Sequence, residues 1–262
     1  MRPNHAKRKI KAGVPVLATG FGIHSLPDSL TLEYLAQKGA LDVAWIEFEH
    51  GAASWRDLSE ISRICDLCGA TSLVRLANNN AADIGRALDL GVQCIMMPHV
   101  NSGEEAERLA RAAYYAPKGL RGIGQPRQGF GDDQYFQKAN DEVLTIAMIE
   151  DVEAIRNLDE ILSVRDIDVF FVAPADLAQT MGPEYLGKPF HPEVQALVVD
   201  TVRRITAEGR ATGAIVNENN VDALIEAGVR LVRFSALEWA VAGVERFRDR
   251  VDQLAGAAGA PR

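Results

Sequence analysis

Two acidic residues in this chain follow apolar, strand-like runs and have the chemistry of metal ligands. Glu150 comes directly after residues 145–149, and Asp176 comes shortly after residues 169–173. Buried strand ends rarely hold unpaired carboxylates, so the two together indicate a shared cation. A site built from two carboxylates, with positions left for water and substrate oxygens, suits Mg²⁺ or Mn²⁺. Salt bridges between these carboxylates and arginines of the same sheet are the alternative.

Other polar side chains near strand-like runs suit carboxylate binding and proton transfer. Arg75 ends the run 71–76, and its planar guanidinium can bind a carboxylate through two parallel hydrogen bonds. His50 stands near Glu47 after another run, and imidazole can take and return a proton near neutral pH. A rim ion pair for Arg75 and a turn-capping role for His50 are the alternatives. His24 and His99 also follow runs, either as pocket residues or as ordinary loop residues.

The lysines do not support Schiff-base chemistry, which needs a lysine that points into the site from a strand. They occupy the N-terminal segment, one helix end and loops: Lys7, Lys9, Lys11, Lys38, Lys118, Lys138 and Lys188. Stabilisation of an enolate would then depend on a metal that acts as a Lewis acid on the keto oxygen.

The elements that must position these side chains alternate between strand and helix patterns. The strand candidates are residues 14–22, 43–48, 71–76, 94–98, 145–149, 169–173, 211–216 and 231–234. The helical patterns cover residues 30–37, 55–68, 81–90, 104–115, 152–161, 192–207, 221–227 and 237–254. This alternation predicts an α/β fold, and its number of units matches a closed (β/α)₈ barrel, or TIM barrel. A doubly wound sheet is the runner-up, but the glycine-rich phosphate-binding pattern expected after its first strand is absent.

The predicted organisation is a single barrel domain over residues 1–262. We expect residues 1–10 and 255–262 to be frayed tails. The stretch 119–140 is long for a barrel connection and is expected to be a functional loop. In such a barrel the active site lies at the carboxyl ends of the strands, where the polar residues above are found.

Composition restricts the partners and the compartment. The chain has 28 Lys and Arg against 36 Asp and Glu, a net charge of −8, which disfavours nucleic acid or an anionic membrane as the partner. No apolar stretch approaches the ~20 residues of a membrane span, so we expect a cytoplasmic protein. The odd set of cysteines, Cys65, Cys68 and Cys94, favours a reducing compartment, and the first two fall in a helical pattern as core residues.

Several motifs across the chain identify a family. They are W-I-E-F-E-H-G at 45–51, S-L-V-R at 72–75, A-L-D-L-G at 87–91, P-K-G-L-R-G-I-G at 117–124, I-E-D-V-E-A at 149–154, A-P-A-D-L-A at 173–178 and H-P-E-V-Q at 191–195. In this order and spacing they closely resemble the 4-hydroxy-2-oxoheptanedioate aldolases, class II pyruvate aldolases of the HpcH/HpaI type. The resemblance runs from about Lys11 to Phe247. It implies a TIM barrel of the phosphoenolpyruvate/pyruvate superfamily type.

The resemblance also implies roles for individual residues. Glu150 and Asp176 correspond to the ligands of a divalent metal, Mg²⁺ or Mn²⁺ and in some cases Co²⁺. Arg75 matches the arginine that steadies the pyruvate oxygens, and His50 matches the general base. Asp89 matches the carboxylate that orients this histidine as a dyad.

The same resemblance extends to the substrates and the assembly. The partners would be a small 2-oxo acid and an aldehyde. Backbone N–H groups around Pro174, Ala175 and Asp176 would bind the substrate carboxylate. Related aldolases assemble as hexamers in which the last helix packs on a neighbour, so a homo-oligomer is expected here.

Three departures from the family pattern concern the pocket. Glu47, also a candidate catalytic residue, stands where members commonly have Asp, so its carboxylate reaches one methylene further. The usual tryptophan of the first strand is replaced within A-T-G-F-G-I-H, and the loop after Gly124 is shorter. The latter two changes border the aldehyde pocket, so the preferred aldehyde does not transfer from the family.

The favoured function is a metal-dependent aldolase in which His50 helps to move a proton to and from the substrate's 4-hydroxyl group. A second hypothesis is an acyl-CoA lyase, or a synthase with another electrophile, that uses the same enolate chemistry. Coenzyme A would call for a basic patch near the strand ends, and no dense one is present. A third is a barrel that only binds a 2-oxo acid, although binding alone needs no general base such as His50.

Overall fold

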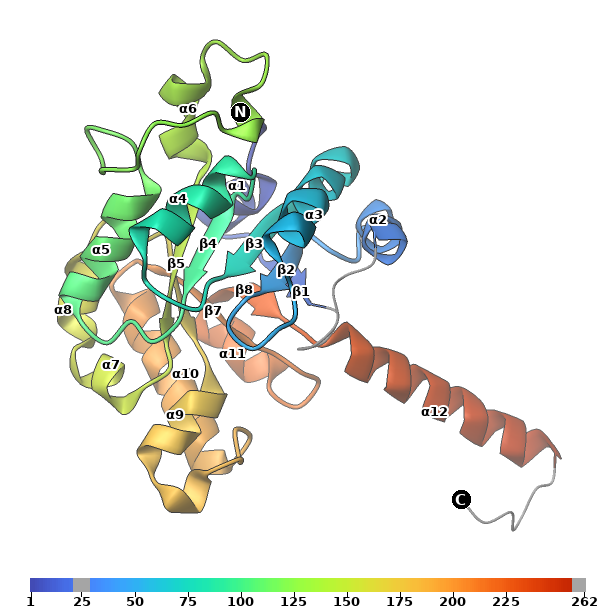
Figure 1. The fold of residues 1–262 in the computed structure, drawn as a ribbon. Helices are drawn as coiled ribbons and strands as arrows, with labels where there is room; N and C mark the ends of the chain where they lie inside the picture. Colours follow the sequence, from blue (N-terminus) through green and yellow to red (C-terminus); the bar gives the residue numbers. More distant parts are fainter. Residues whose placement is uncertain (21–28, 256–262) are drawn as a thin grey trace.

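Eight parallel strands close into a barrel, in sequence order, in a computed structural model that describes residues 1–20 and 29–255 (Figure 1). The strands are β1 (Val16–Thr19), β2 (Val43–Glu47), β3 (Thr71–Arg75), β4 (Cys94–Met97), β5 (Leu144–Ile149), β6 (Val169–Val172), β7 (Ala211–Ile215) and β8 (Val229–Arg233). Each strand pairs in parallel with the next, and β8 pairs with β1 through Leu231 and Val16. The predicted (β/α)₈ fold is confirmed. The end of the predicted first strand and His24 lie outside the described residues.

The helices lie around the barrel, apart from α12, which projects away from it. They are α1 (His5–Lys11), α2 (Ser29–Gln37), α3 (Trp55–Cys68), α4 (Ala81–Asp89), α5 (Gly103–Ala113), α6 (Tyr135–Glu142), α7 (Val152–Arg156), α8 (Leu158–Ser163), α9 (Pro174–Met181), α10 (Pro192–Ala207), α11 (Val221–Ala227) and α12 (Ala236–Ala255), with 3₁₀ turns η1 (Arg127–Gly129) and η2 (Pro183–Tyr185). The predicted helices are present, although 152–161 is divided into α7 and α8 at Asn157. The helices α1, α6 and α9 were not predicted.

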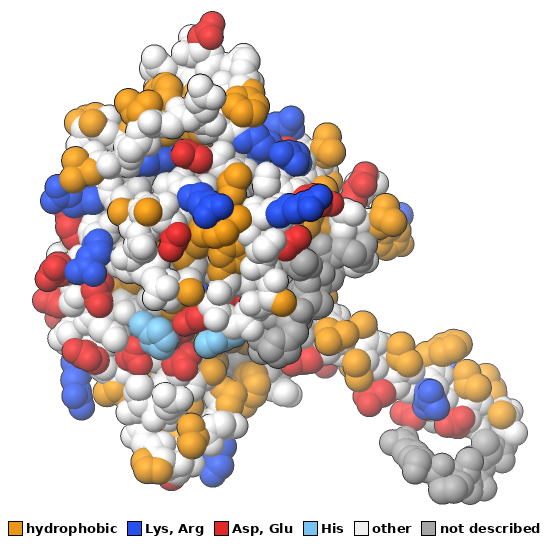
Figure 2. Space-filling view, in the orientation of Figure 1, with side chains coloured by type: hydrophobic (Ala, Val, Ile, Leu, Met, Phe, Trp, Pro, Cys, Tyr) orange, Lys and Arg blue, Asp and Glu red, His pale blue; other side chains and the backbone are white. Residues whose placement is uncertain are grey.

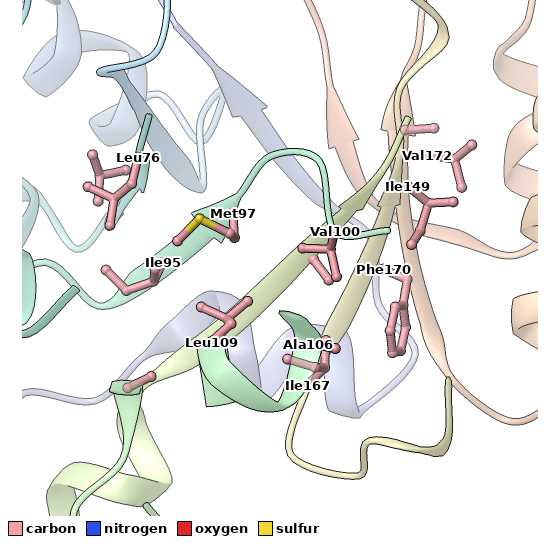
Figure 3. Close-up of a cluster of buried hydrophobic side chains, with 14 of the residues drawn as sticks. Leu76, Ile95, Met97, Val100, Ala106, Leu109, Ile149, Ile167, Phe170 and Val172 are labelled. Carbon is pink, nitrogen blue, oxygen red and sulfur yellow. The ribbon is translucent and has the colours of Figure 1, made fainter. Parts of the chain in front are cut away.

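Successive side chains of a strand point to opposite faces of the barrel wall, and this forms two hydrophobic layers. On β4, Cys94 and Met96 belong to a cluster inside the barrel, whereas Ile95 and Met97 belong to the layer between strands and helices. Figure 3 shows part of the outer layer, in which side chains from β4, β5 and β6 gather around α5. Both faces of β4 are therefore apolar, which is why this strand appears in the sequence as a continuous hydrophobic run.

The N-terminal segment is not a frayed tail, and this prediction was wrong. Asn4 is fully buried and caps α1 by accepting a hydrogen bond from the Lys7 N–H at 2.9 Å. The Lys7 ammonium forms a buried ion pair with Asp168 at 3.0 Å. Ala6 and Ile10 of α1 pack against the cluster inside the barrel. The helix thus covers the amino-terminal end of the barrel. Of the other predicted tail, residue 255 ends α12 and residues 256–262 lie outside the described part.

The long connection 119–140 lies at the end of the barrel opposite the strand carboxyl ends. It joins α5 to β5, and Figure 1 shows α6 near the N-terminus, far from α9. Ion pairs bind it to the barrel helices, with Arg127 contacting Asp66 at 2.7 Å. It contributes no residue to the pocket described below. The expected functional loop therefore does not reach the pocket within this chain.

The last helix, α12, projects away from the barrel (Figure 1) and has no buried residue. Within residues 1–20 and 29–255, no helix combines the length and the hydropathy needed to cross a bilayer.

Candidate active site

A pocket of about 290 Å³ opens at the carboxyl ends of the strands. Trp45, Met148 and Phe171 from the inner cluster line it, and the Trp45 and Phe171 rings pack edge to face with centroids 5.5 Å apart. Its charged or ionisable lining residues are Glu47, His50, Arg75, Glu150, Asp176 and Arg233. Figure 2 shows histidine side chains beside acidic ones near the end of the barrel from which α9 leaves.

Strand periodicity explains why charged side chains meet in this pocket. A residue two positions beyond an inward-facing one also points into the barrel. The inward-facing residues Trp45, Leu73, Met148 and Leu231 are followed two positions later by Glu47, Arg75, Glu150 and Arg233. The barrel interior is therefore apolar below and charged at its carboxyl end.

Three side chains form a candidate metal site. Donor atoms of His99, Glu150 and Asp176 all lie within 4.8 Å of one another. Glu150 is 1% exposed, and its Oε1 accepts a hydrogen bond from the His99 backbone N–H at 2.8 Å. Its Oε2 is buried without a hydrogen-bond partner among the described residues. A buried carboxylate oxygen that lacks a donor fits a cation ligand, so the donor set suits a divalent metal.

Burial raises the pKa of Glu150 to about 7, and the charge of Asp176 adds to this effect. The hydrogen bond and the charge from His99 act in the opposite direction. Glu150 therefore exchanges its proton near neutral pH when no cation is bound.

His99 has a backbone conformation that is uncommon for a residue other than glycine, with φ of 50°. Its Nδ1 lies 2.9 Å from Asp151 Oδ2, and its Nε2 lies 3.5 Å from Glu49 Oε1. Burial lowers the pKa of His99, but the carboxylates of Asp151, Glu150 and Glu49 outweigh it and raise the pKa overall. This residue had two interpretations from sequence, and the structure places it beside the candidate ligands.

Arg75 is held by two glutamates. Its Nε donates to Glu47 Oε2 at 2.8 Å, and its Nη1 lies 2.9 Å from Glu49 Oε2. Glu47 also accepts hydrogen bonds from the indole N–H of Trp45 at 3.1 Å and from the backbone N–H of Glu49 at 2.8 Å. The Glu47 carboxylate is therefore fully engaged, and its geometry is that of a group that positions Arg75.

His50 follows in the turn that Glu47 organises. Its backbone N–H donates to Glu47 Oε1 at 3.3 Å, and Gly51 lets the chain pass so close to Glu47 that a Cβ would lie 2.4 Å from its carbonyl oxygen. The imidazole is 57% exposed, with Nε2 3.8 Å from Glu49 Oε2. It is therefore free to exchange protons with a ligand in the pocket and with water.

Asp89 does not join His50 within this chain. It ends α4, which runs from the carboxyl end of β3 back toward the start of β4, so it lies at the opposite end of the barrel. Its carboxylate pairs with Arg121 at 2.6 Å instead. The expected dyad was wrong for a single chain, because the topology separates the two residues by the length of α4.

The amino terminus of α9 forms part of the pocket wall. Ala175 and Asp176 line the pocket, and no side chain caps the helix at Ala173. The first N–H groups of a helix have no partner within it and can bind an anion. Pro174 was expected to contribute as well, but it has no N–H, so Ala175 and Asp176 are the available donors.

Arg233 is a pocket residue that the sequence interpretation missed. It ends β8 two positions beyond the inward-facing Leu231. The alternating direction of side chains along the predicted strand 231–234 could therefore have identified it.

The family model of the HpcH/HpaI aldolase/citrate lyase family matches residues 29–236, which is more than half of the chain. The chain belongs to this family. It is 34% identical to a 4-hydroxy-2-oxo-heptane-1,7-dioate aldolase of Shigella flexneri over 235 residues, covering 87% of this chain and 85% of the relative. It is 33% identical to a hydroxypyruvate/pyruvate aldolase of Roseobacter denitrificans over 213 residues, covering 79% and 82%. Among solved structures, an HpcH/HpaI aldolase of Desulfitobacterium hafniense superposes with a TM-score of 0.80 at 26% identity, covering 92% and 96%.

In this member of the HpcH/HpaI family, five of the predicted side chains line one pocket: Glu47, His50, Arg75, Glu150 and Asp176. Asp89 lies elsewhere. The structure adds Arg233 to the lining, and it places His99 and Glu49 next to it through their contacts with Glu150 and Arg75.

Proposed function

We propose that the chain is a class II aldolase that reversibly cleaves a 4-hydroxy-2-oxo acid to pyruvate, or a close 2-oxo acid, and an aldehyde. The observation that carries this proposal is the buried, partnerless Oε2 of Glu150 beside Asp176, in a pocket that also holds a fixed arginine. The names of the relatives from Shigella flexneri and Roseobacter denitrificans support the same reaction class, a carbon-carbon lyase.

Glu150 and Asp176 would hold Mg²⁺, Mn²⁺ or Co²⁺. When bound, such a cation supplies a Lewis acid that polarises the 2-oxo group and stabilises the negative charge of an enolate. His99 lies close enough to add an imidazole donor, which would favour transition metals over Mg²⁺.

The donor half of the substrate would be held by Arg75 and by the start of α9. The guanidinium is fixed by Glu47 and Glu49, and its Nη2 makes no hydrogen bond to the described residues, so it can donate to the 2-oxo acid. The N–H groups of Ala175 and Asp176 offer further donors to the carboxylate.

His50 would move the proton that the reaction requires. In cleavage it accepts the proton of the 4-hydroxyl group while the C3–C4 bond breaks and its electron pair forms the enolate double bond. The C4 fragment leaves as an aldehyde, and protonation at C3 gives pyruvate. In the reverse direction His50 returns the proton to the new alkoxide.

The reaction class is tested by pyruvate release from a 4-hydroxy-2-oxo acid before and after treatment with EDTA. We expect activity to disappear on chelation and to return with Mn²⁺ or Mg²⁺. Borohydride added with pyruvate should not inactivate the protein, because no lysine lines the pocket within the described residues. Full activity with all metal removed contradicts the proposal.

Metal affinity should depend on pH in a defined direction. With no cation bound, the Glu150 pKa of about 7 means that the carboxyl is protonated below that pH and must lose its proton to bind metal. The association constant for Mn²⁺ should therefore fall roughly tenfold per pH unit below about pH 7 and level off above it. Calorimetry in buffers of different ionisation enthalpy should also detect proton release. An affinity that is constant between pH 5.5 and 8 excludes this account of Glu150.

We also propose that the chain forms a homo-oligomer, a hexamer by resemblance to its family, in which α12 packs on a neighbouring copy. Six of its exposed apolar side chains form one stripe at helical spacing: Leu237, Val241, Val244, Phe247, Val251 and Leu254. Figure 2 shows hydrophobic side chains along one side of the projecting helix and acidic ones along the other. An apolar pocket of about 550 Å³ next to its start, lined by Leu17, Leu35, Val221 and Trp239 among others, offers a surface for the α12 of a second copy.

The oligomer is tested by light scattering on the full chain. Wild-type protein should have a mass several times that of the 28.5 kDa monomer. Val244→Asp should shift it toward the monomer, because a charge would be buried in the contact. Gln253→Asp is the control, because it adds the same charge at an exposed position on the opposite side of the helix. A monomeric wild type contradicts the proposal.

A further inference from the structure

Arg233 occupies a distinct place in the pocket wall. It pairs in register with Ala18 of β1 and Ile215 of β7, so it stands between these two strands at the carboxyl end of the barrel. The pocket residues on those neighbours, Gly20 and Ile215, carry no charge. The candidate metal ligands follow β5 and β6, and Arg75 ends β3. Arg233 therefore lies on a different part of the pocket wall from Arg75 and the candidate metal ligands, although Arg75 and Glu47 still act on its charge.

The Arg233 guanidinium has no close counter-ion among the residues that the structure describes. Within residues 1–20 and 29–255, no carboxylate oxygen lies within 4.0 Å of its guanidinium, whereas Arg75 pairs with two glutamates. Glu47 and Glu238 act on Arg233 only at longer range, and Glu47 is already engaged by Arg75. Burial lowers the pKa of Arg233, yet a guanidinium remains protonated in proteins. A largely buried cation is costly when no described residue pairs with it, so its position favours an anionic ligand that binds to it.

We propose that Arg233 determines which aldehyde the enzyme accepts, by binding an anionic group that the acceptor carries. The inference rests on the proposed aldolase function and specifies its substrate class. The 4-hydroxy-2-oxo acid would carry a second anionic group on the part of the molecule that leaves as the aldehyde. Arg75 and the α9 amino terminus would keep the donor carboxylate, so two anions are recognised at two places.

Arg233 needs only to bind the anionic group of the acceptor, and it takes no part in the bond changes. A planar guanidinium forms two parallel hydrogen bonds to a carboxylate or a phosphate, and both are stronger than neutral hydrogen bonds. A neutral aldehyde leaves the buried charge unpaired, and the enzyme then loses the binding free energy that an anion supplies. Discrimination between acceptors follows from this difference.

The decisive variant is Arg233→Met, which keeps an apolar side chain of similar length and removes the charge. Arg230→Met is the matched control, because Arg230 lies on the same strand, donates to the Val229 carbonyl and does not line the pocket. Condensation with pyruvate is measured for two pairs of acceptors, 4-oxobutanoate against 4-oxobutanamide, and glyceraldehyde 3-phosphate against glyceraldehyde. The first pair differs mainly in its negative charge, and the second differs by a phosphate group.

Wild type and Arg230→Met should favour the anionic member of at least one pair, and Arg233→Met should lower that kcat/KM ratio about 30-fold or more, chiefly through KM. If Arg233→Met lowers the kcat/KM ratio of the first pair alone, the ligand is a carboxylate. If it lowers the ratio of the second pair alone, the ligand is a phosphate. Unchanged ratios overturn the inference. A parallel loss of pyruvate proton exchange also overturns it, because Arg233 would then serve the donor.

A binding measurement separates this inference from the proposed function. Calorimetric titration of wild type with 4-oxobutanoate alone and with inorganic phosphate alone requires no catalysis. At least one of them should bind about tenfold more weakly to Arg233→Met than to Arg230→Met. If wild type fails to process pyruvate at all, the aldolase proposal fails, while this titration still decides whether Arg233 is an anion site. Equal affinities in the two variants contradict it.

Discussion

Replacing Glu150 by glutamine should abolish metal-dependent cleavage, with a loss of roughly 10³-fold or more in kcat/KM. Glutamine keeps the size of the side chain and can still accept the His99 N–H hydrogen bond, but it removes the negative charge. Lewis-acid stabilisation contributes several kcal/mol to a developing enolate, and each 1.36 kcal/mol corresponds to about a tenfold change in rate. Loss of the cation therefore removes the largest single contribution to the rate.

The measurements for Glu150→Gln are Mn²⁺ titration and pyruvate release at saturating metal. Glu153→Gln is the control, because Glu153 is an exposed carboxylate three residues away that does not line the pocket. Thermal unfolding should show that both variants fold. Wild-type affinity for Mn²⁺ in Glu150→Gln would remove this residue from the metal site.

Replacing His50 by alanine should lower kcat by roughly 10²- to 10⁴-fold, the usual contribution of a positioned general base. Metal affinity should remain unchanged, because none of the contacts that the structure describes joins the imidazole to Glu150 or Asp176. The side chain is 57% exposed, so the change should affect stability little.

Steady-state cleavage and Mn²⁺ titration of the same preparation separate these effects for His50→Ala. Added imidazole should restore part of the rate if the lost group is a base. His5→Ala, an exposed histidine at the other end of the barrel, is the control. Undiminished kcat in His50→Ala would assign proton transfer to another group, with His99 the nearest alternative.

The fold and much of the candidate site could be predicted because strand ends in a barrel share one edge. Glu150 and Asp176 follow neighbouring strands, so recognising β5 and β6 was enough to bring their side chains together. Arg75 and Glu47 are register partners on β3 and β2, and their ion pair follows from that pairing.

The failures have physical causes in contacts distant along the chain. The N-terminal segment is polar and short, but the buried Asn4 and Lys7 find partners at Glu142 and Asp168, which no local pattern reveals. Asp89 was assigned to the dyad by resemblance, and its place at the end of α4 keeps it away from His50 within one chain. His99 reaches the ligands through a positive φ that its residue type does not predict.

Exchange of the methyl protons of pyruvate in D₂O, followed by NMR with and without Mn²⁺ or Mg²⁺, tests the account most directly. Enolisation is the step that the pocket is proposed to promote, and it requires no knowledge of the aldehyde. We predict rapid exchange with added metal, little exchange after EDTA, and exchange lost in Glu150→Gln. Absence of exchange in the metal-loaded wild type would contradict the proposed function.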